Sequence, residues 1–332
     1  MKALVCNEFG PLETLKIQEM PDPVAGEGHI VIDVKAAAVN FPDVLVVQNL
    51  YQFKPEPPFA PGNEVAGLVS QVGPGVEGIK VGDRVFASGG FGGFAEKYLA
   101  PAHSVVAIDD DMPFDEAASF MMVYGTSHHA LKQRADIQPG EILLVLGASG
   151  GVGLAAVELG KAMGARVIAA ASSQEKVDFC LAAGADDGFV YEKNPLDRDQ
   201  QKALSAKIKE MTGGKGADVI YDPVGDDYAE PALRSIAWKG RYLVVGFAAG
   251  NIPKVPLNLA LLKGCQIVGV FWGMFIGVEA DVHKANTAEL MSWYKAGKIK
   301  PRISKHYPLD DALQALQDMA ARKVKGKVVI TP

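Results

Sequence analysis

A glycine-rich turn in the middle of the chain has the residue types and spacing to bind a phosphate. The apolar run Ile142–Leu146 stops at the turn Gly147–Gly153, GASGGVG, and the residues after it have a helical composition. A buried strand that leads through such a turn into a helix brings backbone N–H groups and a helix dipole against an anion. The sequence therefore predicts a pyrophosphate site in this turn. The residues expected to present their backbone to it are Gly150, Gly151, Val152 and Gly153.

The same turn also fits a second chemistry, that of a serine nucleophile. Residues 147–151 form G-x-S-x-G, the nucleophile elbow of α/β-hydrolases, with Ser149 in the nucleophile position. Asp222 with His283 or His306 would supply the acid and the base in the required order. An elbow does not call for Gly153, so the phosphate turn is the preferred interpretation and a serine hydrolase is the alternative.

The end of the next expected strand indicates which nucleotide would bind. A site for NAD places Asp or Glu about 20 residues after the turn. Here the segment 165–171 is followed by Ser172, Ser173, Gln174, Glu175 and Lys176. Hydroxyls and a lysine suit a 2′-phosphate, which a carboxylate would repel, so NADPH is the predicted cofactor. Ser172-x-x-Glu175 also fits a capping box, and both interpretations can hold because a helix N-terminus itself attracts anions.

Two regions of different pattern must position these residues. Residues 1–124 contain short apolar runs separated by glycine and proline, which is typical of a rolled antiparallel unit. Residues 125–262 alternate strand-like and helix-like segments, which predicts βαβ units with a parallel sheet. We assign 263–332 to the first domain. The strands expected along the chain are 2–6, 29–39, 64–72, 84–87, 142–146, 165–171, 188–191, 218–221, 241–245, 266–271 and 327–330.

Composition excludes several classes of protein. The chain has 332 residues, which favours two domains, and its net charge of −6 does not favour a surface for nucleic acid. The three cysteines, Cys6, Cys180 and Cys265, lie far apart and form no disulfide framework. No apolar run approaches the ~20 residues that span a bilayer, and no signal peptide is evident. We therefore expect a cytoplasmic protein that does not bind a membrane.

Together these segments resemble the medium-chain dehydrogenase/reductase superfamily, and within it the zinc-independent quinone oxidoreductase (zeta-crystallin-like) family. The resemblance covers nearly the whole chain. It implies an α/β protein with a Rossmann domain that binds NADPH at 125–262 and a β-rich GroES-like catalytic domain, with the cofactor in the cleft between them, and a homodimer. The segments that carry it are 36–52 (AAAVNFPDVLVVQNLYQ), 58–69 (PFAPGNEVAGLV), 81–85 (VGDRV), 92–100 (GGFAEKYLA), 125–131 (GTSHHAL), 138–153, 221–225 (YDPVG), 240–247 (GRYLVVGF) and 326–330 (GKVVI).

Two departures from the superfamily pattern narrow the expected reaction. Zinc-dependent relatives carry a cysteine where this chain has Asn40 and a histidine where it has Asn63, and their four-cysteine lobe is missing here. A catalytic zinc needs three protein ligands of Cys, His or carboxylate type, so no metal site is expected. The remaining chemistry is hydride transfer from NADPH to a small-molecule acceptor, a quinone or an activated alkene such as an enone or enoyl thioester.

The resemblance also implies roles in catalysis for three residues of the first domain. Asn40 should hydrogen-bond the cofactor or the acceptor, although a local turn contact before Pro42 would also explain it. Asp43 should orient the loop. Tyr51 should line the acceptor pocket and could donate a proton to the reduced oxygen, or be only an aromatic wall.

Further residues match family positions around the cofactor. Thr126 should hold the carboxamide end, unless it is a helix N-cap. Val224 and Phe247 follow strand ends, where α/β sheets bind ligands, and are expected against the ribose and nicotinamide. The positions expected around the 2′-phosphate and adenosine are Ser172, Lys176, Tyr191 and Arg322, of which Arg322 equally fits a solvated helix residue.

Three questions stay open from the sequence. All six histidines are expected to be non-catalytic. Trp272, Met274 and Phe275 would suit an apolar pocket, the core or a subunit contact. A protein that binds NADPH in a purely structural role is the alternative outside the enzymes.

Overall fold

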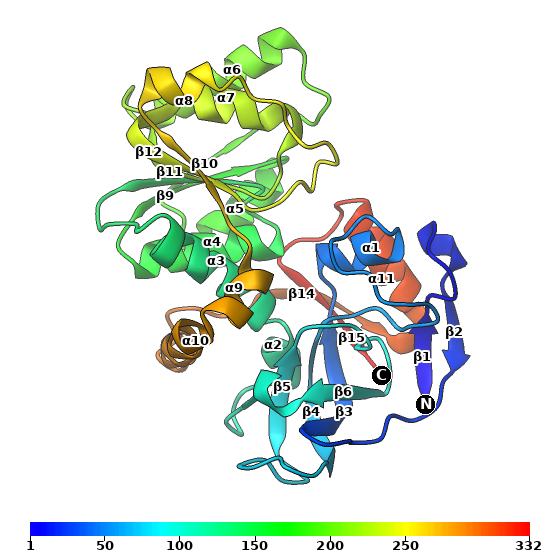
Figure 1. The fold of residues 1–332 in the computed structure, drawn as a ribbon. Coiled ribbons are helices and arrows are strands. Elements are labelled where there is room, and N and C mark those ends of the chain that lie inside the picture. Colours follow the sequence, from blue (N-terminus) through cyan, green and yellow to red (C-terminus); the bar gives the residue numbers. More distant parts are fainter. The chain divides into compact units, whose positions relative to one another are not determined.

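Two units make up the computed structural model, which describes residues 1–332 (Figure 1). The first is Met1–Met122 with Pro301–Pro332, and the second is Val123–Lys300. Both carry a sheet, so the predicted α/β class with one β-rich and one parallel-sheet domain is confirmed. The expected boundary at 262/263 differs from this division. Residues 263–300 belong to the second unit because the strand β13 (Gln266–Gly269) pairs in parallel with β12 (Ile236–Val244).

A six-stranded parallel sheet in the order β10-β9-β8-β11-β12-β13 forms the centre of the second unit. This is the doubly wound order, whose reversal point lies between β8 and β11. Helices α6, α7 and α8 cover one face and α3 and α4 the other (Figure 1). The remaining strands are β8 (Ile142–Leu146), β9 (Arg166–Ala171), β10 (Asp187–Val190) and β11 (Ala217–Asp222). The helices are α3 (Thr126–His129), η4 (Ala130–Arg134), α4 (Gly151–Ala162), α5 (Gln174–Leu181), α6 (Arg198–Met211), η5 (Asp226–Tyr228), α7 (Ala229–Arg234), α8 (Asn258–Lys263), α9 (Trp272–Val278) and α10 (Ala280–Lys295).

The strands of the parallel sheet are nearly continuous apolar runs because both faces are covered. Leu143, Leu144 and Val145 of β8 are fully buried. Leu144 and Leu146 of this strand belong to one core cluster, which residues of α6, α7 and α8 and of the neighbouring strands β9, β11 and β12 complete. The carboxyl ends of β8 and β11 are thereby held side by side at the reversal point.

The first unit is built on a seven-stranded sheet in the order β14-β15-β3-β4-β5-β7, with β6 paired to β3. All its pairs are antiparallel except β14 with β15. The chain's last strand, β15 (Lys327–Thr331), pairs with the end of β3 (His29–Ala38), so residues 301–332 complete this unit. The other strands are β1 (Lys2–Val5), β2 (Lys16–Glu19), β4 (Glu64–Val72), β5 (Arg84–Ser88), β6 (Lys97–Pro101), β7 (Val105–Ala107) and β14 (Ile303–Pro308). The helices are η1 (Leu12–Thr14), α1 (Phe41–Val47), η2 (Ala102–Ser104), α2 (Phe114–Ala118), η6 (Leu309–Asp311) and α11 (Ala312–Ala320), and η3 (Met121–Gly125) crosses into the second unit.

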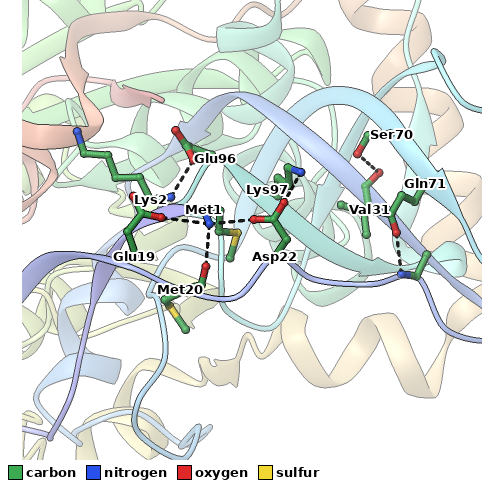
Figure 2. A network of polar contacts seen from close by, with 11 residues as sticks. Met1, Lys2, Glu19, Met20, Asp22, Val31, Ser70, Gln71, Glu96 and Lys97 are labelled. Atoms are coloured by element: carbon green, nitrogen blue, oxygen red, sulfur yellow. Dashed lines mark hydrogen bonds and ion pairs between the residues drawn. The ribbon is translucent and has the colours of Figure 1, made fainter.

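Polar contacts fix the β1–β2 ribbon beside the larger sheet (Figure 2). The amino group of Met1 donates to Met20 O at 2.7 Å and to Asp22 Oδ1 at 2.8 Å. Asp22 also accepts from Lys97 Nζ on β6 at 2.5 Å. These hydrogen bonds, that from Lys97 foremost, lower the pKa of Asp22 to about 2.

Candidate active site

The glycine turn between β8 and α4 has the close backbone packing that its sequence predicts. Gly150 is the N-cap of α4, and its N–H donates to Gly147 O at 3.0 Å. A Cβ atom on Gly153 would lie 2.4 Å from Gly147 O and 2.9 Å from Ala148 Cα. Only glycine fits there, so the helix starts directly against the strand, and the N–H groups of its first turn have no acceptor within the helix. Such a helix start can hold a pyrophosphate.

A hydroxyl network joins this turn to two other segments of the unit. Ser127 Oγ donates to Val152 O at 2.9 Å and lies 2.8 Å from Tyr221 Oη. Tyr221 is fully buried, and this burial raises its pKa. The network fixes the turn relative to α3 and β11. Ser127 and Tyr221 stand in two of the segments that carry the family resemblance, 125–131 and 221–225, but the sequence alone singled out neither residue.

Asp222, at the end of β11, shapes the neighbouring turn. Its Oδ1 accepts from the N–H groups of Val224 at 2.7 Å and Gly225 at 2.9 Å, and its Oδ2 accepts from the Tyr242 hydroxyl. Burial raises the pKa of Asp222, and the three hydrogen bonds oppose that rise. A Cβ atom on Gly225 would lie 2.9 Å from Phe247 Cδ1. Val224 and Phe247 therefore lie at adjoining strand ends. Val224 also lies beside the glycine turn, because a Cβ atom on Gly147 would be 2.7 Å from Val224 Cγ2.

Three of the four residues expected around the 2′-phosphate and adenosine lie just beyond strands of the parallel sheet: Ser172 and Lys176 after β9, and Tyr191 after β10. Tyr191 N donates to Ala171 O at 2.9 Å. The Tyr191 ring packs on the Tyr228 ring, with 4.8 Å between the two ring centroids. Ser172 and Lys176 are half-buried just beyond β9. The capping box proposed for Ser172 and Glu175 is wrong by one residue, because the N-cap of α5 is Ser173.

Thr126 is not a helix N-cap. It follows Gly125, which has helical backbone angles and ends the π-helix η3, so the helix runs continuously through this position. Thr126 is half-buried and adjoins Ser127, which bonds to the glycine turn. Thr126 is therefore held near the glycine turn by its place in the continuous helix, next to Ser127, and does not cap a helix.

Ser149 lacks the surroundings of a nucleophile. It is 5% exposed and does not have the positive φ of a strained turn residue. Both carboxylate oxygens of Asp222 already accept hydrogen bonds, from the N–H groups of Val224 and Gly225 and from the Tyr242 hydroxyl. His306 bonds to Asp115 in the first unit at 2.9 Å, and His283 packs on Trp272 and Phe275. The geometry gives the hydrolase alternative no support.

In the first unit, Asn40, Asp43 and Tyr51 surround the start and end of α1. Asn40 N donates to Asp43 Oδ2 at 2.8 Å. Burial raises the pKa of Asp43 to about 7, although the N–H groups of Asn40 and Gly62 and the charge of Lys327 lower it. Tyr51 is half-buried, and burial together with the Asp43 carboxyl raises its pKa.

Arg322 also lies in the first unit. It is exposed just after α11 and has a φ of 56°. Arg322 is exposed, as the second interpretation expects, but it stands just beyond the helix and not within it. Its expected role at the adenosine end stays a prediction.

A buried polar cluster lies next to Asn40. Lys327 Nζ donates to Asn40 Oδ1 at 2.6 Å and lies 3.5 Å from Glu64 Oε2. Asn40 Nδ2 donates to Glu64 Oε2 and to Asn63 Oδ1, each at 3.2 Å. Burial lowers the pKa of Lys327, while the charges of Glu64 and Asp43 oppose this. Sequence reasoning missed Lys327 and Glu64, although both stand in segments that carried the resemblance, and it named Asn63 only as the position of a zinc ligand in other proteins.

Two general features of the molecule bear on the chemistry. No group of three or more His, Cys, Asp or Glu residues is placed to hold a metal ion. None of the helices is long and apolar enough to cross a membrane.

Comparison with known proteins gives matches along the whole chain. Residues 26–110 match the family model "Alcohol dehydrogenase GroES-like domain", and residues 151–292 match "Zinc-binding dehydrogenase". A quinone oxidoreductase-like protein 2 homolog of Nematostella vectensis is 36% identical, over 99% of this chain and 88% of that protein. Human quinone oxidoreductase is 32% identical, over 99% of this chain and 97% of its own.

Solved structures agree with these sequence matches. The Escherichia coli quinone oxidoreductase complexed with NADPH superposes with a TM-score of 0.89 at 29% identity, covering 100% of both chains. A mycobacterial protein complexed with NADPH gives a TM-score of 0.91 at 32% identity, again over 100% of both chains.

Proposed function

Since the chain belongs to the zinc-independent quinone oxidoreductase family of the medium-chain dehydrogenase/reductase superfamily, we propose that it is an NADPH-dependent oxidoreductase that reduces a quinone. The observation that carries the proposal is the glycine turn, whose backbone leaves no room for a Cβ at Gly153. Two proteins of this fold bind NADPH in their solved structures. An activated alkene is the second candidate acceptor, since its reduction also needs only a hydride and a proton.

The chain's own residues would bind NADPH along the carboxyl edge of the parallel sheet. Within the turn Gly150–Gly153, the pyrophosphate would be held through the backbone N–H groups of Gly151, Val152 and Gly153, because the N–H of Gly150 donates to Gly147 O. Ser172 and Lys176 would bind the 2′-phosphate, and Tyr191 would lie against the adenine. Val224, held in place by Asp222, would contact the nicotinamide side together with Phe247 and Thr126. When bound, NADPH supplies the hydride.

Residues of the first unit would handle the acceptor. Tyr51 keeps its proton at neutral pH, since the ordinary tyrosine pKa of 10.0 already lies well above 7 and is raised further here, so its hydroxyl can donate to an oxygen that gains negative charge. Asp43 would hold the loop that begins at Asn40 through the hydrogen bond to Asn40 N. Most of the rate would come from proximity and orientation of the two reactants.

We propose further that the protein forms a homodimer through the edge of the parallel sheet. Strand β13 has a partner on one side only. Beside it, α8 exposes Leu261 (80%) and Leu262 (67%), and Ile267 of the strand itself is also exposed. An open edge with apolar neighbours favours pairing with a second copy of the same edge.

The test of the enzymatic function is NADPH oxidation with 9,10-phenanthrenequinone, which has no free vinyl carbon to alkylate cysteines. We expect turnover with NADPH and little with NADH, and a Lys176→Glu variant with raised KM for NADPH. Treatment with EDTA should leave the rate unchanged, since no step needs a metal. Turnover with NADH alone would refute the cofactor assignment. Thermal protection by NADPH without turnover of any quinone or enone would instead indicate a structural NADPH-binding protein.

A further inference from the structure

The side-chain amide of Asn40 has little hydrogen-bonding capacity left for a ligand. Its carbonyl oxygen accepts from Lys327 Nζ at 2.6 Å, and its NH₂ group donates to Asn63 Oδ1 and Glu64 Oε2. An amide NH₂ has two hydrogens, so both are used inside the protein. Asn40 is also only 5% exposed. It is therefore poorly suited to donate to an acceptor molecule.

Chemistry dictates the orientation of each amide in this cluster. An ammonium only donates and a carboxylate only accepts, so Asn40 must turn its oxygen to Lys327 and its nitrogen to Glu64. That nitrogen can only donate to Asn63, so Asn63 must offer its Oδ1. The Nδ2 of Asn63 is left facing away from Asn40. It has no partner in the structure, and Asn63 is half-buried immediately before β4.

The three groups thus form a chain of hydrogen bonds with one direction. Lys327 donates to Asn40, Asn40 donates to Asn63, and Asn63 has an NH₂ left to donate. Hydrogen bonds in such a chain polarise one another in a buried environment, and here the first donor is a cation. Glu64 keeps the ammonium in place, and its other oxygen accepts from Met122 N at 2.8 Å. The terminal N–H is a preorganised donor for a negatively charged oxygen.

We propose that Asn63, rather than Asn40, donates the hydrogen bond to the carbonyl oxygen of the acceptor, and that Lys327 is the residue that positions this donor. The inference rests on the proposed reduction of a quinone by NADPH. In that reaction the quinone gains a hydride and NADPH is oxidised to NADP⁺. Electron density moves onto the quinone oxygen, the N–H of Asn63 stabilises it, and a proton from Tyr51 or water completes the hydroquinone.

An Asn63→Asp variant tests the donor, because it keeps the shape and replaces the NH₂ group by an acceptor. We expect kcat with 9,10-phenanthrenequinone to fall by about 100-fold, as for loss of one oxyanion donor, with an unchanged Kd for NADPH. The matched control is Asn7→Asp, an exposed position of the same unit, which should behave as wild type. An unchanged kcat in Asn63→Asp would overturn the proposal. So would a rise in the NADPH Kd that accounts for the whole loss, since Asn63 would then contact the cofactor.

The role of Lys327 needs a variant that folds. Lys327→Met alone would leave the buried Glu64 carboxylate without its counter-ion and is expected to be unstable. The double variant Glu64→Gln/Lys327→Met removes both charges. We expect it to keep its Kd for NADPH and to lose kcat by about tenfold, because the donor chain then starts from a neutral group. A double variant that folds and keeps the wild-type kcat would refute the positioning role.

A readout without turnover separates this inference from the proposed function. In the NADP⁺ complex of protein labelled with ¹⁵N-asparagine, 9,10-phenanthrenequinone should move the side-chain NH₂ signals of Asn63 downfield and leave those of Asn7 in place. The shift should be smaller in the double variant. Asn63 signals that move with NADP⁺ but not with the quinone would refute the inference even if the wild type reduces quinones. A wild type without quinone turnover would count against the proposed function, while the response of Asn63 would still decide the donor assignment.

Discussion

Asp43 lies buried beside one ammonium and one other carboxyl group, and desolvation raises its pKa to about 7, from 3.8 in the unfolded chain. Between these two values the folded protein binds more protons than the unfolded chain. Stability that this group contributes is therefore present at low pH and is lost as pH rises through about 7. The size of the effect is at most about 4 kcal/mol.

The Asp43→Asn variant should remove that dependence. Its amide oxygen can still accept from Asn40 N, and it carries no charge to desolvate. We expect the difference in unfolding free energy between the variant and the wild type to increase in favour of the variant from about pH 5 to pH 8. Urea unfolding at a series of pH values measures this, and parallel pH profiles for the two proteins would contradict it.

The Gly153→Ala variant tests the close approach of helix and strand in the turn. The new Cβ would lie 2.4 Å from a backbone oxygen, so the helix start must shift. We expect a loss of about 1–3 kcal/mol in stability and a weaker affinity for NADPH, measured by urea unfolding and fluorescence titration. Gly277→Ala in α9 is the matched control, because a Cβ atom at that position would meet nothing within 4 Å. Equal behaviour of the two variants would refute the argument.

At the scale of elements, local patterns predicted the strands well. The runs at 64–72 and 142–146 are β4 and β8, because alternating or continuous apolar residues reflect how many faces of a strand are buried. Long-range partners were beyond such patterns. Lys327 and Glu64 are 263 positions apart, and each resembles an ordinary surface charge until β15 and β4 enter the same sheet. The N-cap of α5 was misplaced by one residue because two serines stand together.

The buried His128 of α3 contacts α10, and protonation of its ring would destabilise the fold. Burial lowers the pKa of His128 to about 4, although Glu289 opposes this. His128 Nε2 bonds to Glu289 at 2.8 Å, and Lys132 also contacts that carboxylate. The unfolded chain protonates this histidine near pH 6.5. The stability that neutral His128 contributes is therefore fully present above pH 6.5. It falls by up to about 3 kcal/mol as the pH drops to 4.

His128→Gln should make the protein less sensitive to acid, since glutamine can still donate to Glu289. The exposed His306, replaced by Gln, serves as the control. We expect the unfolding free energy of His128→Gln to gain on the wild type from about pH 7 to pH 5, measured by denaturant titration. A gain of the same size in His306→Gln would show that His128 is not the source.

At the scale of the whole molecule, the domain boundary was harder to predict than the family. Motifs distributed from residue 36 to residue 330 identified the family, and the parallel sheet followed from the alternation of strands and helices. Whether 263–300 joins one unit or the other depends on the pairing of β13 with β12. A strand of four residues with no distinctive composition does not specify its partner.

The proposed dimer edge provides a prediction at this scale. Leu261→Glu/Leu262→Glu places two charges on the exposed apolar surface of α8 and should yield a monomer. Sedimentation velocity at several protein concentrations measures the state. Val24→Glu, equally exposed in the first unit, is the control and should keep the wild-type value. A wild-type protein that sediments as a monomer would contradict the proposal.

The two π-helical segments that flank α3 have a consequence for helix phase. Met121–Gly125 and Ala130–Arg134 each hold one more residue per hydrogen-bonded turn than an α-helix. Deleting one residue from η3 would restore regular spacing and rotate everything after it by about 100°. The Ser127 hydroxyl would then leave Val152 and Tyr221 without any change in its own identity. A relative that lacks one residue in this segment would therefore lose the Ser127 contact to the glycine turn, just as if Ser127 itself had been replaced.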